Sequence, residues 1–413
     1  MKSGEEALAL VEDELNGYIL KIKSAEQDMT ISAEQSGLKY TGTEQIQKNV
    51  DQQDENYWFK AVFYEHKYDA LDVTLDQAKL QETMNGLYCM NPTTPQQPVD
   101  AYIQYDDTKK EYVIVDEVIG NTVVPESLYA ALEKAILARE DEVDMTTNEF
   151  YVQPKYFAAG KEATEAKATL DKYMSTVINY EDLGSTFTVT GEDIHNFIKV
   201  DKDFKITFDK ETMKTFISEK ISPVFNTVGQ KRTIDSPGSG TFTAEGGTYG
   251  WQVGLIAERT KMIENIKAGG TVNREPEYIQ DGAVKDKKND IGDSYVDVSI
   301  SDQKLWVVKK GKVVLESDFV SGSVASNHET HKGIFMVERK QKNYRMEDYN
   351  VTVKYWLPFN LDQGEGFHDA SWRSSFGGSI YKSDGSHGCI NLPPKIAKKM
   401  YEIIDTQFPV IVH

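Results

Sequence analysis

Apolar and polar positions follow a helical period at the start of the chain and a strand period soon after. Residues 5–23 carry apolar side chains at near-helical spacing from Leu8 to Ile22, which predicts an amphipathic helix that passes into a strand. The aromatic and branched run 58–64 predicts another strand. Residues 73–80 predict a short strand whose Asp76 caps a following helix.

This pattern occurs a second time. Residues 206–213 repeat the strand, the threonine and the capping aspartate, here Asp209, and the helical run 124–136 has a counterpart in 254–266. The distance from the capping aspartate to the later helix is 48 residues in the first copy and 45 in the second. A repeat this long is typical of duplicated domains rather than of a solenoid. We therefore predict two tandem α+β modules, residues 1–155 and 160–275.

The last third of the chain has a different pattern. Residues 276–290 are rich in charge and turn formers and are predicted to be a linker. Strict alternation in 295–301, followed by the apolar runs 305–308 and 313–315, predicts a β-meander. A helix near 396–404 and a final strand at 410–412 complete a mostly-β domain, residues 291–413. The predicted fold is thus multidomain.

Composition narrows the range of partners. The chain has 46 Lys and Arg against 66 Asp and Glu, a net charge of −20, and no basic patch, so nucleic acid is not an expected partner. Residues 291–413 are neutral, with 15 basic and 15 acidic residues, so the whole excess lies in residues 1–290. The acidic residues of this part either form a solvated surface or repel other polyanions.

Cys89 and Cys389 are too few for a disulfide framework. The chain has no apolar run of 18 or more residues, so no membrane span is predicted in it.

The candidate chemistry lies in Ser386–Asn391 and in the segment 366–370, which ends about twenty residues before the thiol. Only a thiolate attacks carbonyls, so Cys389 needs an imidazole or backbone N–H groups to favour its anion, and His368 and His387 are the two candidates. Gly388 lets the peptide turn so that neighbouring N–H groups can form an oxyanion hole. This spacing is what nucleophilic acyl transfer requires.

Two other interpretations of the thiol stay open. A cysteine and a histidine two residues apart can bind metal, although zinc sites usually show further cysteine or histidine ligands. A single cysteine can also be an inert buried side chain. Five of the seven histidines fall in the last 123 residues, which disfavours that second interpretation.

These residues resemble the signature of the L,D-transpeptidases, the family with a YkuD-type catalytic domain, over about residues 291–413. The resemblance implies that Cys389 is the nucleophile and His368 the proton donor and acceptor. It further implies that the backbone of Asp369 orients the imidazole. In the same way His387 and Gly388 would form the oxyanion pocket, and Asn391 would support the substrate. The family's Thr-Pro-x-Gly-x-Phe hairpin element corresponds here to Thr330–Phe335, with histidine in place of proline.

The resemblance implies a reaction as well. A peptidoglycan stem tetrapeptide would acylate the cysteine, and an amine of a second stem would resolve the thioester into a cross-link between third-position residues. No metal or organic cofactor is expected, carbapenems are expected to acylate the thiol, and glycan and stem peptides are the expected partners. An L,D-carboxypeptidase, or an inactive wall-binding protein, is the alternative. The expected location is extracytoplasmic, with an N-terminal anchor that this chain does not carry.

An aromatic segment hinged by glycines precedes the thiol and is interpreted as a substrate channel, although each ring can equally be core. Arg373 has two possible roles, to bind a stem carboxylate or to pair with Asp369 or Asp384. The residues assigned to this channel are Trp356, Gly364, Trp372, Arg373 and Tyr381.

The two modules are acidic and poor in histidine, so they are predicted to be non-catalytic. They resemble the paired peptidoglycan-binding domains that precede some Gram-positive L,D-transpeptidase domains. A role as spacers carries equal weight. Trp58 and Trp251 are candidates for glycan contact, but such rings are more often core.

Overall fold

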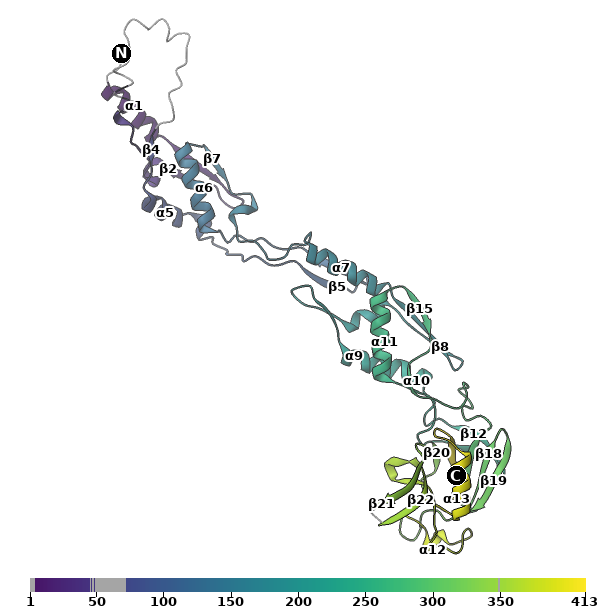
Figure 1. The fold of residues 1–413 in the computed structure, drawn as a ribbon. Helices are drawn as coiled ribbons and strands as arrows, with labels where there is room; N and C mark the ends of the chain where they lie inside the picture. Colours follow the sequence, from purple (N-terminus) through teal and green to yellow (C-terminus); the bar gives the residue numbers. More distant parts are fainter. Residues whose placement is uncertain (1–3, 45, 47, 49–71, 348–349) are drawn as a thin grey trace. The chain divides into compact units, whose positions relative to one another are not determined.

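The computed structural model describes residues 4–44, 46, 48, 72–347 and 350–413 (Figure 1). The chain divides into two compact units, Met1–Ala168 with Val200–Lys205, and Thr169–Lys199 with Ile206–His413. The strand predicted at 58–64, and with it Trp58, lies outside the described residues. No helix in the described ranges combines the length and the apolar composition that crossing a membrane requires.

The first unit contains the predicted opening helix and strand, followed by a β-hairpin and two longer helices. Its elements are α1 (Gly4–Asn16), β1 (Ile19–Lys23), β2 (Met29–Ser32), α2 (Ala33–Ser36), β3 (Lys39–Tyr40), β4 (Val73–Thr74), α5 (Gln77–Asn85), β5 (Tyr102–Asp106), β6 (Glu111–Val115), α6 (Pro125–Ala138), β7 (Glu142–Asp144) and two 3-10 turns, Tyr88–Met90 and Asn148–Phe150. Helix α7 (Lys161–Met174) continues from this unit into the next.

A three-stranded sheet, ordered β2-β1-β7, organises the first unit. Strand β1 pairs antiparallel with β2 and parallel with β7. Leu20 and Ile22 of β1 are fully buried in one core with Leu128 of α6, a helix that lies beside β7 in Figure 1. The predicted cap is present, because the Asp76 carboxylate accepts the Lys79 N–H at 3.1 Å where α5 begins.

The second module repeats this arrangement. Its elements are β8 (Val177–Asp182), β9 (Ser185–Val189), α8 (Gly191–Ile194), β10 (Ile198–Val200), β11 (Ile206–Phe208), α9 (Lys210–Phe216), a π-helical turn (Ile217–Ile221), α10 (Ser222–Phe225), β12 (Arg232–Ser236), β13 (Gly240–Ala244), β14 (Gln252–Val253), α11 (Leu255–Ala268), β15 (Thr271–Arg274) and β16 (Tyr278–Gln280).

The strand order of the two modules is the same. Strand β8 lies between its antiparallel partner β9 and its parallel partner β15, as β1 lies between β2 and β7. Asp209 caps α9 by accepting two backbone N–H groups, and α11 precedes β15 as α6 precedes β7. The predicted duplication of one α+β pattern is therefore confirmed by the topology.

The C-terminal part is mostly β, as predicted. Its elements are β17 (Tyr295–Ser299), β18 (Lys304–Lys309), β19 (Lys312–Asp318), β20 (Gly333–Met336), β21 (Gln341–Met346), β22 (Val351–Asn360), β23 (Glu365–Asp369), α12 (Tyr381–Asp384), β24 (Ile390–Leu392), α13 (Pro394–Ile403) and β25 (Pro409–Val412). The predicted meander is β17, β18 and β19, and the predicted last helix and strand are α13 and β25.

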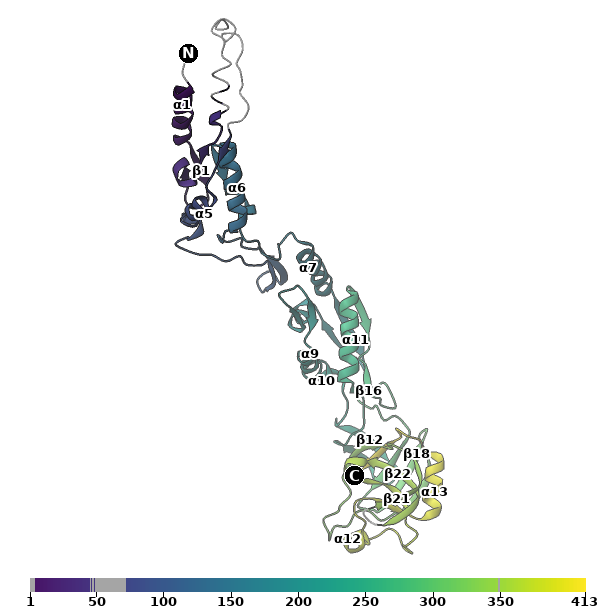
Figure 2. The same cartoon turned by 60° about the vertical axis from the view of Figure 1, so that its left-hand side comes forward.

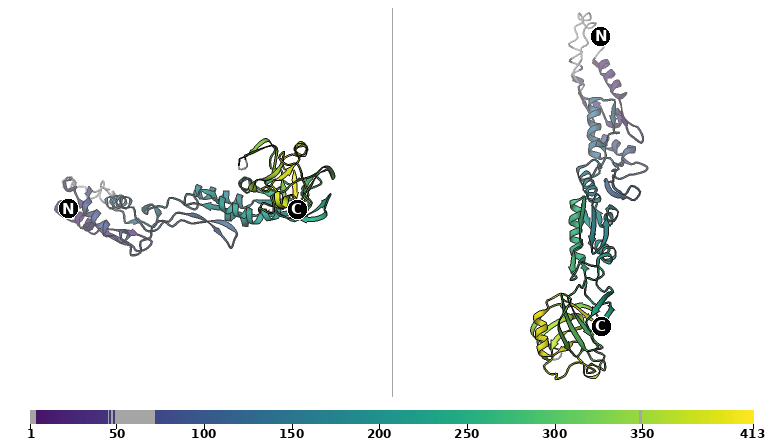
Figure 3. Two further views of the ribbon diagram at one scale, coloured as in Figure 1. Left: turned by 90° about the horizontal axis from the view of Figure 1, so that it is seen from below. Right: turned by 90° about the vertical axis from the view of Figure 1, so that its right-hand side faces the viewer.

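Two sheets enclose the core of this domain. One is ordered β19-β18-β17-β25-β20 and the other β21-β22-β23-β24. Val298 and Val410 of the first sheet share a core with Phe359, Phe367 and Ile390 of the second. Helix α13 contributes Met400 to this core and lies on the outside of the strands in Figure 2 and in the right-hand view of Figure 3. The second sheet carries the candidate chemistry.

The hairpin β12–β13 belongs by sequence to the second module but packs on the C-terminal sheets. Ile234 and Ala244 share a small core with Ile334 and Ile411. The Tyr295 hydroxyl donates to the Asp235 carbonyl at 2.6 Å. The second module and the C-terminal domain therefore share one hydrophobic cluster within the same compact unit.

The predicted linker 276–290 contains β16 and ends at the buried Asp290. Arg232 forms two hydrogen bonds to the Asp290 carboxylate, at 2.6 Å and 2.8 Å, and both side chains are almost wholly shielded from solvent. The Thr227 hydroxyl also donates to this carboxylate. Buried charges of this kind need such partners, so the pair ties the end of the segment to the hairpin.

We predict that Asp290→Ala lowers the free energy of unfolding by about 3–5 kcal/mol, because it leaves the Arg232 guanidinium buried without its counter-charge. Chemical denaturation of the full chain measures this. Glu316→Ala is the matched control, since it removes an exposed carboxylate paired with Lys304 and is expected to leave the unfolding curve nearly unchanged. Equal effects of the two substitutions would contradict the structural role of the buried pair.

Candidate active site

The thiol of Cys389 and the imidazole of His368 lie on the same face of the four-stranded sheet. Strand β24 runs parallel to β23, with Phe367 opposite Ile390 and His368 opposite Asn391. Phe367 and Ile390 face the core, so the alternate residues of the two strands face the other way. Cys389 immediately precedes β24 and therefore shares a face with His368, in diagonal register.

The sulfur of Cys389 is held between two backbone groups of β23 and the turn before it. The thiol donates to the Gly364 carbonyl at 3.4 Å, and the Gly366 N–H bonds to the sulfur. The side chain also packs with Val353 and Trp356 in a small buried cluster. The Trp356 ring centre lies 6.0 Å from that of His368, so thiol and imidazole both border one tryptophan.

A tight turn presents the cysteine. Gly388 has φ +114°, a conformation that residues with a side chain rarely adopt, and a Cβ built on it would lie 3.1 Å from the Glu365 carboxylate. The Gly388 carbonyl accepts from the Thr330 hydroxyl at 2.7 Å, while its N–H donates to the Ser386 hydroxyl oxygen at 3.1 Å. Ser386 donates in turn to the Cys389 carbonyl at 2.5 Å. Glycine is thus required by both conformation and space.

His368 is buried and has a defined tautomer. Its Nδ1 lies 3.1 Å from the Asp369 carbonyl oxygen, and because a carbonyl only accepts, Nδ1 carries the proton and Nε2 is the basic nitrogen. The Asp369 carboxylate accepts the N–H groups of Lys354 and Tyr355 at 2.7 Å and 2.9 Å, which fixes this residue against β22. The Asp369 backbone therefore lies where it can orient the imidazole.

Burial makes the neutral forms of both groups more stable. It raises the pKa of the Cys389 thiol to about 12, with a smaller increase from the Glu365 charge and an opposing effect of the Gly366 N–H. Burial also lowers the pKa of His368, and the positive charge of Arg373 acts in the same direction, while Asp369 opposes both. At neutral pH the pair is consequently a neutral thiol beside a neutral imidazole.

Two buried polar atoms next to His368 have no hydrogen-bond partner among the described residues. They are Nε1 of Trp356 and Oδ1 of Asn391, and these two residues flank His368 on either side in the sheet. Both residues are at least 97% buried. Because buried polar groups are nearly always paired, one unpartnered donor and one unpartnered acceptor here are a notable exception.

The other residues assigned to the substrate channel differ in their surroundings. The Trp372 ring centre lies 5.8 Å from that of His368, and the residue is 52% exposed. Arg373 pairs with Asp384 at 3.1 Å, one of the two partners considered for it, and its Nε has no partner in the described part of the chain. Gly364 precedes β23 with φ +69°, and Tyr381 begins the short helix α12.

His387 is exposed and its ring stands 4.6 Å from that of His328. His387 therefore lies at the surface, whereas His368 is buried. His368 is the one that lies on the thiol's face of the sheet.

Sequence reasoning missed Glu365, which is 1% exposed. Its carboxylate accepts from Asn360 Nδ2 at 2.8 Å, from the His331 N–H at 3.0 Å and pairs with His331 Nδ1 at 2.8 Å. Glu365 fills the space beside Gly388. The sequence marks Glu365 as a charged residue at the start of a buried strand, which calls for a partner, but it does not identify His331 as that partner.

Comparisons with known proteins agree with this arrangement. Residues 293–412 match the YkuD family, described as the L,D-transpeptidase catalytic domain, and residues 29–144 and 160–274 each match the family described as "Putative peptidoglycan binding domain". The curated proteins contain no match.

Solved structures of L,D-transpeptidases are also similar to the chain. A crystal structure of a cysteine-to-serine mutant of the Enterococcus faecium enzyme is 28% identical, with 60% of this chain and 100% of that chain covered and a TM-score of 0.44. The catalytic domain of the Enterococcus faecium enzyme, solved by NMR, is 36% identical over 29% of this chain and 97% of that chain (TM-score 0.26). The same domain acylated by ertapenem is 37% identical with the same coverage (TM-score 0.27).

The chain therefore belongs to the L,D-transpeptidases, with the catalytic domain at its C-terminus and two peptidoglycan-binding domains before it.

We predict that iodoacetamide alkylates Cys389 slowly at pH 7 and that the rate rises about tenfold for each pH unit, without levelling off below pH 9. The reason is that the pKa of about 12 leaves little thiolate at neutral pH, and only the thiolate reacts. Mass spectrometry of the Cys389 peptide from a Cys89→Ser chain measures the rate without interference. A plateau near pH 8 would instead indicate a thiolate–imidazolium pair.

Proposed function

We propose that this chain is a peptidoglycan L,D-transpeptidase that joins third-position residues of two stem peptides through an acyl-enzyme on Cys389. The observation that carries the proposal is the buried thiol on the same sheet face as a buried imidazole whose Nδ1–H bonds to Asp369, which makes Nε2 the proton acceptor. The ertapenem-acylated catalytic domain of the Enterococcus faecium enzyme supports the same kind of acylation here.

The first half of the reaction transfers the donor stem to the enzyme. The sulfur of Cys389 attacks the carbonyl of the third residue of a tetrapeptide stem, the L-centre of a diamino acid, as its proton passes to His368 Nε2. The tetrahedral intermediate collapses, its C–N bond breaks, and the leaving D-alanine amine takes the proton back from His368. The product is a thioester.

The second half uses an amine of another stem, or of a crossbridge attached to it. The amine attacks the thioester carbonyl and loses a proton to His368, the C–S bond breaks, and the sulfur is reprotonated. The new amide is the cross-link. Because the imidazole transfers every proton and no redox change occurs, the two half-reactions balance with the two stems alone.

The oxyanion of each tetrahedral intermediate needs donors near the turn. The Gly388 N–H is directed at Ser386, so we assign the main role to the Cys389 N–H, with Gly388 supplying the turn and His387 approaching from the exposed side. The unpartnered N–H of Trp356 and carbonyl oxygen of Asn391 match the acceptor and donor of a substrate amide. We assign the donor stem to that position, with Trp372 as an outer wall.

The two N-terminal modules complete the proposal. Their family supports binding to peptidoglycan, and we propose that they hold the catalytic domain at the extracytoplasmic wall. Arg373 is paired with Asp384, which favours a structural role, in which it keeps the segment after β23 in place. Tyr381 begins α12 at the end of this segment, whereas Gly364 precedes β23.

The proposal predicts a covalent dimer with loss of D-alanine when the full chain is incubated with a disaccharide tetrapeptide and the products are identified by mass spectrometry. Cys389→Ala abolishes the dimer, and His368→Gln lowers its rate by about 10²- to 10⁴-fold, the usual effect of removing a general acid–base. Glu316→Ala, which removes an exposed carboxylate of β19, is the control and leaves the rate unchanged. Tripeptide without dimer would indicate an L,D-carboxypeptidase. Neither product, together with no meropenem adduct, would indicate an inactive wall-binding protein.

The pH dependence follows from the neutral pair. His368 must be neutral to accept the thiol proton, and its pKa is lowered, so the rate of Cys389 acylation by meropenem stays constant as the pH falls to 6.5 and declines only below that value. Stopped-flow fluorescence or quenched mass spectrometry measures the rate. A decline centred above pH 7 would contradict the assignment of the proton acceptor.

A further inference from the structure

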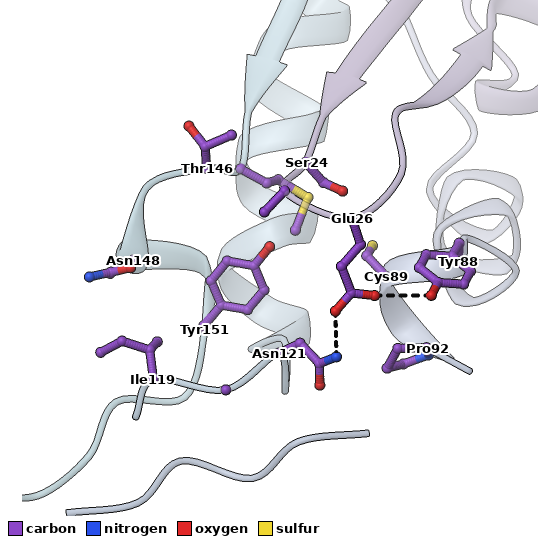
Figure 4. A pocket seen from close by; sticks show the side chains of 13 residues that line it. Ser24, Glu26, Tyr88, Cys89, Pro92, Ile119, Asn121, Thr146, Asn148 and Tyr151 are labelled. Carbon is purple, nitrogen blue, oxygen red and sulfur yellow. Dashed lines mark hydrogen bonds between the residues drawn. The ribbon is translucent and has the colours of Figure 1, made fainter. Parts of the chain in front are cut away.

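A hollow of about 170 Å³ opens in the first module where β1 and β7 end (Figure 4). Glu26 in the β1–β2 loop, Tyr88, Asn121 and Tyr151 line it with polar groups. Met145 and Cys89 contribute apolar walls, and both are buried. The hollow is small, so a single side chain or a comparable group fits it better than a whole polymer segment.

Glu26 carries the charge of this hollow. Its two carboxylate oxygens accept from Asn121 Nδ2 at 2.7 Å and from the Tyr88 hydroxyl at 2.9 Å, the two dashed bonds of Figure 4. These hydrogen bonds lower the pKa of Glu26, so the group is anionic at neutral pH. Within the described ranges no lysine, arginine or histidine forms an ion pair with it. The Glu26 carboxylate is therefore positioned by neutral donors, and its negative charge can interact with a bound cation.

The surroundings of Glu26 suit a cation on an aliphatic stem. The Tyr88 and Tyr151 rings line the hollow together with Glu26. Aromatic faces attract ammonium groups, and a carboxylate binds them with charge-assisted hydrogen bonds. Cys89 is a neutral thiol because burial raises its pKa to about 11, so with Met145 it offers an apolar surface to methylene groups.

The two modules differ in the turn that carries Glu26. Ser32 and Thr190 are equivalent, because each stands at the end of the second strand of its hairpin and forms a capping box with the next short helix. Between the paired strands the first module has the open loop 24–28, whereas the second has longer strands and only the turn 183–184. The open loop that places Glu26 at the hollow is therefore a local feature of the first module.

We propose that this hollow binds the primary ammonium group at the end of an aliphatic side chain, as an unlinked stem-peptide diamino acid or its crossbridge carries. This proposal depends on the proposed function only for the identity of the polymer that carries the amine, which is peptidoglycan. It means that the first module holds strands whose amines are still free, which are the strands that serve as acceptors in cross-linking.

The experiment uses the full chain labelled with [¹³C-methyl]methionine. The probe is a disaccharide tripeptide with a free side-chain amine, which lacks the terminal residue of a donor. The methyl signal of Met145 reports binding in the hollow, and that of Met346, which packs against the Cys389 cluster, reports binding at the catalytic domain. We expect the Met145 signal to shift with saturation. We expect Glu26→Gln to raise the midpoint concentration at least about tenfold through loss of the charge-assisted bond.

Two controls test whether the shift of the Met145 signal depends on the Glu26 carboxylate and on the free amine of the probe. Glu34→Gln removes an exposed carboxylate of α2 outside the hollow and is expected to leave the midpoint unchanged. The same tripeptide with its amine acetylated is expected not to shift Met145. A tripeptide extended by a crossbridge residue distinguishes a bridge amine from the side-chain amine, and tighter binding of either one supports the proposal.

Three results would overturn the proposal. They are an unmoved Met145 signal, equal shifts from free and acetylated probes, and equal shifts from the disaccharide without a peptide. The spectrum itself shows whether Glu26→Gln is folded, and a Tyr151→Ala chain, expected to weaken binding as well, gives an independent check. Meropenem acylation of Cys389, measured separately, shows whether the proposed catalytic function fails independently of the binding site.

Discussion

The parallel pairing of β23 with β24 is the interaction on which the catalytic domain depends. It sets His368 opposite Asn391 and leaves Cys389 at the start of the second strand, on the face away from the core. Parallel strands require a long crossover, and here residues 370–389 supply it, with Trp372, Arg373 and α12 on the way. His368 and Cys389, which are twenty-one positions apart in the sequence, thus lie on neighbouring strands of one sheet.

Much of the fold could be predicted from the sequence, because helix caps and strand alternation depend on residues that are close together in the chain. Asp76 and Asp209 identify helix starts through a contact with the next three residues. The alternation in 295–301 identifies a strand, but it predicts one that is half-buried, whereas β17 is buried on both faces. The ion pair of Glu365 with His331 could not be predicted, since 34 residues separate the two in sequence and they meet only in the folded domain. The buried contact of Arg232 with Asp290 was hidden for the same reason, because 58 residues separate the partners and a charge-rich stretch resembles an exposed linker.

The two modules show how a duplicated fold diverges. Aligned on their capping boxes and helix starts, Ile22 and Leu128 of the first module correspond to Tyr180 and Glu258 of the second. The first pair is apolar and fully buried. In the second, the Tyr180 hydroxyl donates to Glu258 at 2.6 Å and Arg274 completes the network. The second module therefore uses its charges to satisfy one another inside the core, whereas the first places an unneutralised carboxylate at its surface.

The candidate active site also contains buried polar groups without a partner among the described residues, and we propose that they make the nucleophile specific. A thiolate permanently stabilised by a neighbouring cation would react with any small electrophile that reached it. In this site the low-dielectric surroundings keep thiol and imidazole neutral, and the buried polar atoms of Trp356 and Asn391 have no partner among the described residues. In the mechanism that we propose, a peptide supplies the missing donor and acceptor, and charge separation between Cys389 and His368 becomes favourable only as the tetrahedral oxyanion forms against main-chain N–H groups. On this proposal, selectivity for a stem peptide and reactivity of the sulfur have one physical origin, which is the burial of both groups on the same sheet face.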